Sequence, residues 1–370
     1  MPRLTEIANF LNSAGWGDAQ RLPLPGDAST RTYTRLRHGP NTAMLLNQPQ
    51  SAESSACPPD ASPADRERLG YNAVARLAGA DTRQFAAVAA ELGMRGLSAP
   101  RLLAADHSRG LLLIEDLGDA RFADIIRDGA DERDLYAHAV DVLLELHRHP
   151  APKVMRAAPG IAAPLLAYDG HAMMAEVALL PDWFMPVASG AECPASARQS
   201  YLAAWGQVLS QLEEAAPVLI LRDYHAENLM WLPDRQGPAR VGLLDFQDAL
   251  AGAPAYDLIS LLEDARRDVA PALASAMLEA YCKARTARDG DFSEKAFRQE
   301  AAVLAAQRNA KIIGIFARLW KRDGKPRYLG FLPRMWGYME RDLEHQAMKP
   351  LADWFSAHVP NEWRGVPSIG

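Results

Sequence analysis

The chain has few cysteines and no long apolar run. Its three cysteines, Cys57, Cys193 and Cys282, lie far apart among 370 residues and form no C-x-x-C pair. This spacing offers neither a disulfide framework nor a cysteine zinc site, and it suits a reducing compartment. No stretch approaches the ~20 apolar residues that a membrane-spanning helix needs. The first residues form a helix-like pattern broken by polar side chains, which is unlike a secretory signal. We therefore expect a cytoplasmic protein with no membrane partner.

An excess of positive charge is also missing. Lysine and arginine number 40 against 46 aspartates and glutamates, which gives a net charge of -6. Because nucleic-acid binding depends on clustered basic residues, and no long basic run is present, we expect no nucleic-acid partner. A hydrophobic fraction of 49% and a charged fraction of 23% are typical of a folded globular protein.

One stretch, Val218 to Asp248, carries the chemistry. An apolar run ends at Arg222-Asp223, and Asn228 follows Asp223 by five residues. After a turn rich in proline and glycine, a second apolar run, Val241 to Leu244, leads directly to Asp245. The pattern predicts a small hairpin that brings three polar side chains to one edge.

These three side chains suit phosphoryl transfer. Asp223 could orient an acceptor hydroxyl and accept its proton, while Asn228 and Asp245 could hold Mg²⁺ on the phosphates of ATP. Protein kinases carry a similar loop, in which an aspartate precedes an asparagine by five residues. The alternative is that Asp223 and Asn228 form a turn and that Asp245 merely ends a strand. The apolar strand before each aspartate favours the catalytic interpretation.

The first third of the chain carries most of the other strand signals. Strands are predicted at Thr30–Arg37, at Thr42–Leu46, after Pro100 and at Leu111–Ile114. Apolar residues at helical spacing predict a helix from Asp81 to about Met94. The polar segment from Gln48 to Asp65, rich in serine and proline, is predicted to be a mobile loop.

Two connections in this part could bind a nucleotide. The glycine-containing segment at 26–30 could cover phosphates with its backbone N–H groups, although such turns occur in many folds. Glu115 to Asp119 would link two lobes, and its backbone could contact adenine. The alternative for this second segment is a simple turn from strand to helix.

Helices dominate after Ala120. They are predicted over 131–149, 196–214, 252–264, 271–285 and 293–320, with Pro150–Pro164 as an irregular connection and no strand outside the catalytic hairpin. The fold class expected is therefore α+β.

Several blocks resemble the aminoglycoside phosphotransferase branch of the kinase-like enzymes, and within it the bacterial anomeric amino-sugar kinases. The blocks are GDASTRTY (26–33), LLIEDLGD (112–119), RDYHAENL (222–229), LLDFQDALAGAPAYDL (243–258) and QRNAKIIGIFARLWKRDGKPRYL (307–329). The resemblance implies a bilobal protein-kinase-like fold. A small antiparallel-sheet lobe would span residues 1–116, and a larger helical lobe would span residues 117–370. It further implies phosphorylation of the C1 hydroxyl of N-acetylmuramate and N-acetylglucosamine, with ATP and Mg²⁺, during cell-wall recycling.

The resemblance also assigns residues to the site. The nucleotide would be bound by Gly26, Asp27, Ala28, Ser29, Thr30, Arg31, Glu115 and Leu117. The sugar would be bound by Tyr224, His225, Gln247 and Asp248. Asp223 would be the base, and Asn228 and Asp245 would be the metal ligands.

One departure from many kinases concerns a lysine on the strand after the phosphate loop. The strand here, Thr42–Asn47, has none, and the amino-sugar kinases that the chain resembles also lack it. Arg31 is the candidate to offset the phosphate charge, with Arg35 behind it. The alternative is that both are solvated charges on the strand face.

A cationic stripe is predicted on the last long helix. Arg308, Lys311, Arg318 and Arg322 recur at intervals of three, seven and four residues, so they share a face. This pattern commonly marks an amphipathic surface helix. An acidic sugar would give it a function, because arginine can bind a carboxylate through two hydrogen bonds.

Two other functions stay open at this stage. The chain could phosphorylate another small hydroxylated substrate, such as an aminoglycoside, choline or homoserine. It could also be a pseudokinase that binds nucleotide without chemistry, which only the missing lysine supports. The presence of Asp223, Asn228 and Asp245 together argues against the pseudokinase.

Overall fold

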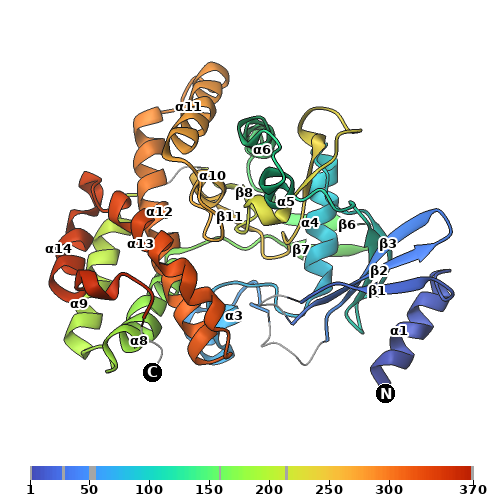
Figure 1. Ribbon diagram of the computed structural model, residues 1–370, viewed down its shortest axis with the longest axis horizontal. Helices are drawn as coiled ribbons and strands as arrows, with labels where there is room; N and C mark the ends of the chain where they lie inside the picture. The colour runs from blue at the N-terminus through green and yellow to red at the C-terminus, as the bar shows by residue number, and fades with distance from the viewer. Residues whose placement is uncertain (1, 27–29, 50–55, 158–159, 213–215, 368–370) are drawn as a thin grey trace. The chain divides into compact units, whose positions relative to one another are not determined.

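The computed structural model describes residues 2–26, 30–49, 56–157, 160–212 and 216–367. The chain forms two compact units. The first unit comprises Met1–Leu166 and Leu221–Ala251, and the second comprises Ala167–Ile220 and Gly252–Gly370. Figure 1 shows their secondary structure. In the described part of the chain, no helix has the length and apolar character needed to cross a membrane.

The first unit is built on a five-stranded antiparallel sheet with the strand order β1-β2-β3-β5-β4. Its strands are β1 (Gln20–Pro23), β2 (Thr32–His38), β3 (Asn41–Asn47), β4 (Leu102–Asp106) and β5 (Leu111–Glu115). Its helices are α1 (Pro2–Ser13), α2 (Pro63–Leu69), α3 (Tyr71–Val74), α4 (Thr82–Met94), α5 (Phe122–Arg127) and α6 (Glu132–Leu146). Smaller elements are β6 (Val154–Ala157), β7 (Ile161–Pro164), η2 (Ala226–Asn228), β9 (Leu229–Trp231), η3 (Gly237–Arg240) and β10 (Val241–Leu243). The strand β11 (Leu250–Gly252) begins in this unit and ends on the first residue of the next segment of the second unit.

The sheet follows from the sequence pattern of its strands. β5 pairs with β3 on one side and with β4 on the other, so four consecutive residues of its LLLIE sequence are buried. β2 and β3 form a tight hairpin in which His38 faces Asn41. Gly39 takes φ +59° in this turn, a conformation that glycine adopts without steric cost.

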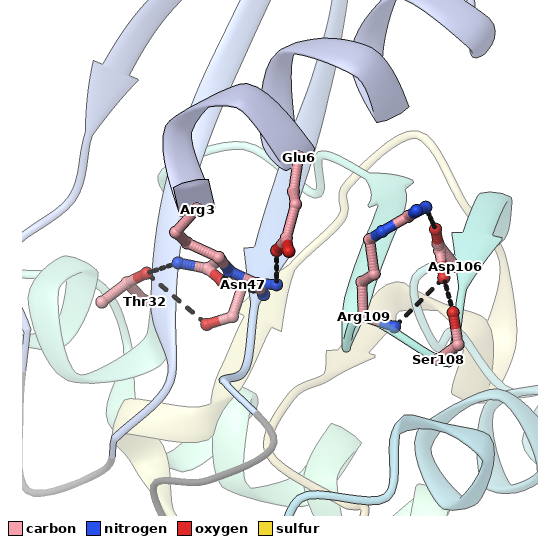
Figure 2. A network of polar contacts seen from close by, with 7 residues as sticks. All are labelled: Arg3, Glu6, Thr32, Asn47, Asp106, Ser108 and Arg109. Atoms are coloured by element: carbon pink, nitrogen blue, oxygen red, sulfur yellow. Dashed lines mark hydrogen bonds and ion pairs between the residues drawn. The ribbon is translucent and has the colours of Figure 1, made fainter. Parts of the chain in front are cut away.

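Helix α1 covers one face of the sheet. Its residues Ile7, Phe10 and Leu11 form a core cluster with residues of β2, β3 and β5. Polar contacts fix the start of the helix, because Arg3 Nε donates to Asn47 Oδ1 at 2.9 Å and Arg3 Nη1 pairs with Glu6 (Figure 2). Figure 2 also shows Asp106 at the turn after β4, where Ser108 and Arg109 donate to its carboxylate.

The second apolar run forms β10 as expected, but its hairpin partner is β9 and not the run at 219–221, so the predicted pairing was wrong. The hairpin of β9 and β10 belongs to the first unit. The backbone N–H of Leu243 donates to Ser98 O at 2.7 Å, and Arg121 forms an isolated antiparallel bridge with Met230. Ser98 Oγ donates to Ala239 O at 2.6 Å. Residues 221–251, which contain this hairpin, therefore belong to the same compact unit as the sheet. The expected lobe boundary at residue 116 divides the chain differently, and it stays a prediction.

The second unit is helical. Its helices are α7 (Gly170–Val177), α8 (Met185–Ser189), α9 (Ala195–Leu209), α10 (Ala255–Leu262), α11 (Pro271–Arg288), α12 (Glu294–Lys321), α13 (Leu332–Asp342) and α14 (Lys349–His358). Short elements are η1 (Leu180–Phe184), β8 (Val218–Ile220), η4 (Pro326–Phe331), η5 (Gln346–Met348) and η6 (Asn361–Trp363). Helix α12 is central to the core. At Gly314 an added Cβ would lie 2.4 Å from the carbonyl carbon of Leu179, so only glycine permits this close approach.

The antiparallel sheet and the many helices confirm the α+β class, and the predicted helices are present with shifted ends. Two local predictions were wrong. The 150–164 connection contains the hairpin β6–β7, and the predicted loop ending at Asp65 already includes the start of α2. Ser62 and Asp65 form a capping box there. Alanine and proline give little strand signal, and the serine- and proline-rich composition obscured the cap.

Candidate active site

The catalytic loop begins with a strained residue. Arg222 follows the buried strand β8 and takes φ +72°, which is uncommon for any residue other than glycine. Its guanidinium is buried, and Nη1 donates to Ala75 O at 3.2 Å. This contact holds the loop where it turns outward, and the next residue, Asp223, is exposed. Strain of this kind persists where the surroundings hold a residue in place, and it is often found at functional sites.

Asn228 lies beside Asp223. Its backbone N–H donates to His225 O at 2.8 Å, and its side-chain Nδ2 donates to Asp223 O at 3.0 Å. Nδ2 also lies 3.3 Å from Nε2 of the buried His225. With the nitrogen of the amide turned toward the loop, Oδ1 is the atom of Asn228 that could coordinate a cation.

Asp245 follows β10 and also takes a positive φ, +55°. Its Oδ1 accepts hydrogen bonds from Arg31 Nη1 and from Gln247 Nε2, both at 2.9 Å. Among the described residues, every hydrogen bond to this carboxylate ends on Oδ1, which leaves Oδ2 as the oxygen available to a ligand. The sequence placed Arg31 and Asp245 in one site, and the structure brings them into contact.

Asp245 is attracted to Arg31 and repelled by the second carboxylate of the site, Asp223. Partial removal from water raises the pKa of Asp245, and the negative charge of Asp223 adds to the rise, while Arg31 opposes it. A divalent cation would relieve this repulsion. The donor set also fits Mg²⁺, because Asn228 Oδ1 and Asp245 Oδ2 are hard oxygen ligands of the kind that Mg²⁺ prefers.

Asp248 lies deeper, with its side chain 14% exposed. Its Oδ1 accepts the backbone N–H of Ala78 at 2.6 Å, and its Oδ2 lies 3.2 Å from Gln247 Nε2 and 3.5 Å from Arg31 Nη2. Burial alone would raise the pKa of Asp248, but the charge of Arg31 and the Ala78 N–H outweigh it and lower that pKa. Asp248 is therefore held as a carboxylate between backbone and side-chain donors.

The sequence of this chain matches the model of the phosphotransferase enzyme family over residues 22–292. The chain belongs to this family. It is 46% identical over 357 residues to the N-acetylmuramate/N-acetylglucosamine kinase of Caulobacter vibrioides, an alignment that covers 96% of this chain and 97% of that protein.

Two solved structures show the shared fold of this phosphotransferase at 14% sequence identity. The microcompartment-associated aminopropanol kinase superposes with a TM-score of 0.56 over 95% of this chain and 98% of that chain. The aminoglycoside phosphotransferase APH(2'')-Ib, bound to ADP, superposes with a TM-score of 0.54, again over 95% of this chain and 98% of that chain. The resemblance of the sequence to aminoglycoside phosphotransferases and the expected bilobal protein-kinase-like fold are both confirmed.

Only part of the phosphotransferase's predicted nucleotide loop can be described. Gly26, Thr30 and Arg31 are in the structure, whereas Asp27, Ala28 and Ser29 lie outside the described residues. In the predicted linker, the carboxylate of Glu115 is engaged by Arg101 Nε at 3.1 Å and by Arg235 Nη2 at 2.8 Å. The backbone N–H of Glu115 also has a protein partner, because it donates to Arg101 O at 2.9 Å.

Leu117 lies over the catalytic hairpin. A Cβ added to Gly242 of β10 would lie 2.9 Å from Leu117 Cδ1 and 3.0 Å from Met230 Cβ, so this glycine allows the hairpin and the linker to pack closely.

The predicted sugar ligands of the phosphotransferase have different surroundings. Tyr224 is 1% exposed and its hydroxyl donates to Ala139 O at 2.8 Å, so its side chain fixes the loop to α6. His225 and Gln247 are buried beside Asn228 and Asp245, respectively. Gln247 and Asp248 are joined by a hydrogen bond. Because the side chain of Tyr224 is buried and its hydroxyl is bonded to Ala139, we do not propose Tyr224 as a sugar ligand.

The predicted cationic stripe is not one continuous exposed surface. Arg308 is 4% exposed and its Nη1 donates to Glu263 O at 2.9 Å. Lys311 Nζ lies 3.3 Å from Oε1 of the fully buried Glu176 and donates to Tyr256 Oη at 3.2 Å. Arg318 is half-buried. Arg308 and Lys311 thus make structural contacts within the second unit, and a sugar-binding role for the three stays a proposal.

Two site residues were missed by the sequence analysis. Burial together with the charge of Asp245 raises the pKa of Tyr33 to about 12, against the opposing effect of Arg31, so its phenol stays neutral. Ala78 supplies its backbone N–H to Asp248 from 170 residues away. Tyr33 lies in the GDASTRTY block and could have been found as the inward neighbour of Arg31 on a strand. No local signal could have found Ala78.

Proposed function

We propose that this phosphotransferase is a sugar 1-kinase that transfers the γ-phosphoryl group of ATP to the anomeric hydroxyl of N-acetylmuramate and N-acetylglucosamine. The observation that carries the proposal is the hydrogen bond from Asn228 to the backbone of the exposed Asp223. Asp245, in the same site, already binds the guanidinium of Arg31. The name of the Caulobacter relative, at 46% identity over 357 residues, supports the choice of sugar.

We expect an in-line transfer with a positioned base. Asp223 would accept the proton of the anomeric hydroxyl while the hydroxyl oxygen forms its bond to the γ-phosphorus and the bond to the β-phosphate oxygen breaks. A hemiacetal hydroxyl is more acidic than an ordinary alcohol, so a carboxylate suffices as the base. Positioning and charge stabilisation would supply most of the acceleration.

Asn228 Oδ1 and Asp245 Oδ2 would hold Mg²⁺, which when bound neutralises charge on the phosphates. Arg31 would stabilise the transferring group in place of a strand lysine. Its planar guanidinium can bind two phosphate oxygens, whereas a lysine contacts them as a point charge.

The remaining assignments complete the proposal. Residues 1–116 would form the lobe that covers the nucleotide, with the segment at 26–30 over the phosphates and the backbone of Glu115 and Leu117 at the adenine. His225 and Gln247 are proposed sugar contacts, and Arg308, Lys311 and Arg318 are proposed for an acidic sugar. The substrate would come from cell-wall recycling, and the use of ATP favours a cytoplasmic location.

The test is an ATP-consumption assay with N-acetylmuramate, N-acetylglucosamine, kanamycin and choline, each with and without Mg²⁺. We expect Mg²⁺-dependent turnover with the two amino sugars only. The methyl glycoside of N-acetylglucosamine, which lacks a free anomeric hydroxyl, is the matched control and should not react. Phosphorus NMR of the product should show a phosphate on C1. Turnover of the methyl glycoside, or a phosphate on C6, would exclude the anomeric assignment.

A further inference from the structure

We propose that Asp248 is a positioning residue for Arg31, which it holds beside Asp245, and that it does not bind the sugar. The inference rests on the proposed kinase function, since Arg31 is there the phosphate-binding cation. It replaces the sugar contact that the sequence suggested for Asp248.

The contacts of Asp248 carry this assignment. Oδ1 accepts the Ala78 N–H at 2.6 Å, and Oδ2 faces Gln247 Nε2 at 3.2 Å and Arg31 Nη2 at 3.5 Å. Both oxygens thus have protein donors, and the side chain is only 14% exposed. A sugar hydroxyl would have to compete with a backbone N–H and a guanidinium, and charge-assisted bonds of this kind are the stronger ones.

The donor to Asp248 is itself fixed by buried arginines. Arg66, which is 1% exposed, donates from Nη2 to Val74 O at 2.6 Å and from Nε to Ala73 O at 3.3 Å, at the end of α3. Arg222 donates to Ala75 O at 3.2 Å. The segment from Ala75 to Ala78 therefore contacts both the catalytic loop, through Arg222, and the metal-binding segment, through Asp248.

Arg31 uses the two amino groups of its guanidinium for different partners. Nη1 lies 2.9 Å from Asp245 Oδ1, and Nη2 lies 3.5 Å from Asp248 Oδ2. The Asp245 carboxylate is also a proposed metal ligand, so a bound cation would compete with Arg31 for its charge. Asp248 has no such competing ligand and can keep Arg31 in place when phosphates arrive. Its role is thus to act through Arg31.

The test is a double-mutant cycle read by equilibrium binding of ATP in the presence of Mg²⁺ and in the absence of sugar. In Asp248→Asn the side-chain oxygen can still accept the Ala78 N–H, but the charge that holds Arg31 is lost. We expect Asp248→Asn to weaken ATP binding about tenfold, which corresponds to ~1.4 kcal/mol. In an Arg31→Ala background the same change should have little further effect, because the two residues act as a unit. The KM for sugar should stay within about twofold of wild type, since a sugar contact of Asp248 would change it most.

The matched control is Asp106→Asn. Asp106 also accepts bonds from an arginine side chain, a backbone N–H and a second side chain, Ser108, all at the turn after β4 (Figure 2). We expect unchanged ATP binding in this variant. Should Asp248→Asn not fold, as judged by thermal unfolding, Asp248→Glu retains the charge on a longer side chain and enters the same cycle.

Two results would overturn the inference. One is an increase in the sugar KM without loss of ATP affinity in Asp248→Asn, and the other is an equal loss of ATP affinity in the wild-type and Arg31→Ala backgrounds. Failure of the proposed function would look different, because wild-type protein would then bind no ATP or would phosphorylate neither amino sugar.

Discussion

Asn228 donates a hydrogen bond from its Nδ2 to the backbone carbonyl of Asp223 at 3.0 Å. The proposed metal ligand therefore holds the proposed base directly, so a change at Asn228 should affect both the metal and the proton transfer. A change confined to the carboxylate of Asp223 should affect only the proton transfer.

The first prediction concerns Asp223→Asn. The amide cannot accept the proton, so kcat should fall by about 100- to 10,000-fold, the usual contribution of a positioned base. The affinity for ATP should change little, because Asp223 is not a proposed metal ligand. Steady-state kinetics together with equilibrium nucleotide binding would check both. Retention of more than about a tenth of kcat, a loss below ~1.4 kcal/mol, would exclude Asp223 as the base.

The second prediction compares three variants of the metal site. Asp245→Ala and Asn228→Ala should each abolish the Mg²⁺ dependence of nucleotide binding, because each removes an oxygen ligand. Asn228→Asp keeps an oxygen for the metal but loses the Nδ2 donor to Asp223 O. It should therefore retain Mg²⁺-dependent binding and still lose kcat.

Titration of nucleotide with and without Mg²⁺ distinguishes these metal-site variants. Unchanged Mg²⁺ dependence in Asp245→Ala would rule out its role as a ligand. An Asn228→Asp variant with full kcat would show that the bond to Asp223 has no catalytic role.

How far the sequence predicts this site depends on how local each signal is. Asp223 and Asp245 were found because each follows an apolar run, and Asn228 was found because it lies five residues after Asp223. The bonds that fix Asp248 and Arg31 join residues 170 and 214 positions apart, and no local pattern reports them. Arg308 looked like a surface charge by helical spacing, yet it is buried against the carbonyl of Glu263 at the end of α10. Periodicity gives a face of a helix, but neighbouring elements decide whether that face reaches water.

The third prediction compares Arg31, which directly precedes β2, with Arg35, which lies within β2. Arg31→Ala should raise the KM for ATP and lower kcat, because the phosphates lose their protein cation. Arg35 is held elsewhere, with Nε 2.8 Å from Asp116 Oδ2 and Nη1 2.6 Å from Asp119 Oδ1. Arg35→Ala should therefore change both constants much less. Equal and small effects would mean that Arg31 contributes no phosphate binding.

The fourth prediction concerns a buried pair of carboxyl groups in the second unit. Asn309 Nδ2 donates to Glu263 Oε2 at 2.6 Å and to Asp342 Oδ2 at 2.8 Å. Burial raises the pKa of Asp342 well above its ordinary value, and the charge of Glu263 adds to this. Burial likewise raises the pKa of Glu263, against the opposing effects of Asn309, Arg341 and Arg308. Asp342 is therefore the group that keeps a proton in the folded protein.

The sign of the pH dependence follows from these raised pKa values. The folded state binds protons that the unfolded state releases above about pH 4, the ordinary carboxyl range. The stabilisation is therefore complete below that pH and is lost as the pH rises through the raised folded pKa. We expect the free energy of unfolding to fall with rising pH over this interval, in denaturant titrations at fixed ionic strength.

The variant Asp342→Asn isolates this effect. Its amide can donate to Glu263 in place of the bound proton and does not titrate, so the variant should lose much of the downward slope of unfolding free energy against pH. Asp182→Asn is the matched control, because Asp182 pairs with Arg198 in an exposed position in the same unit. It should keep the slope of the wild type. If Asp342→Asn and the wild type showed the same slope, the shared proton would not lie on this pair, and another buried acid would have to carry it.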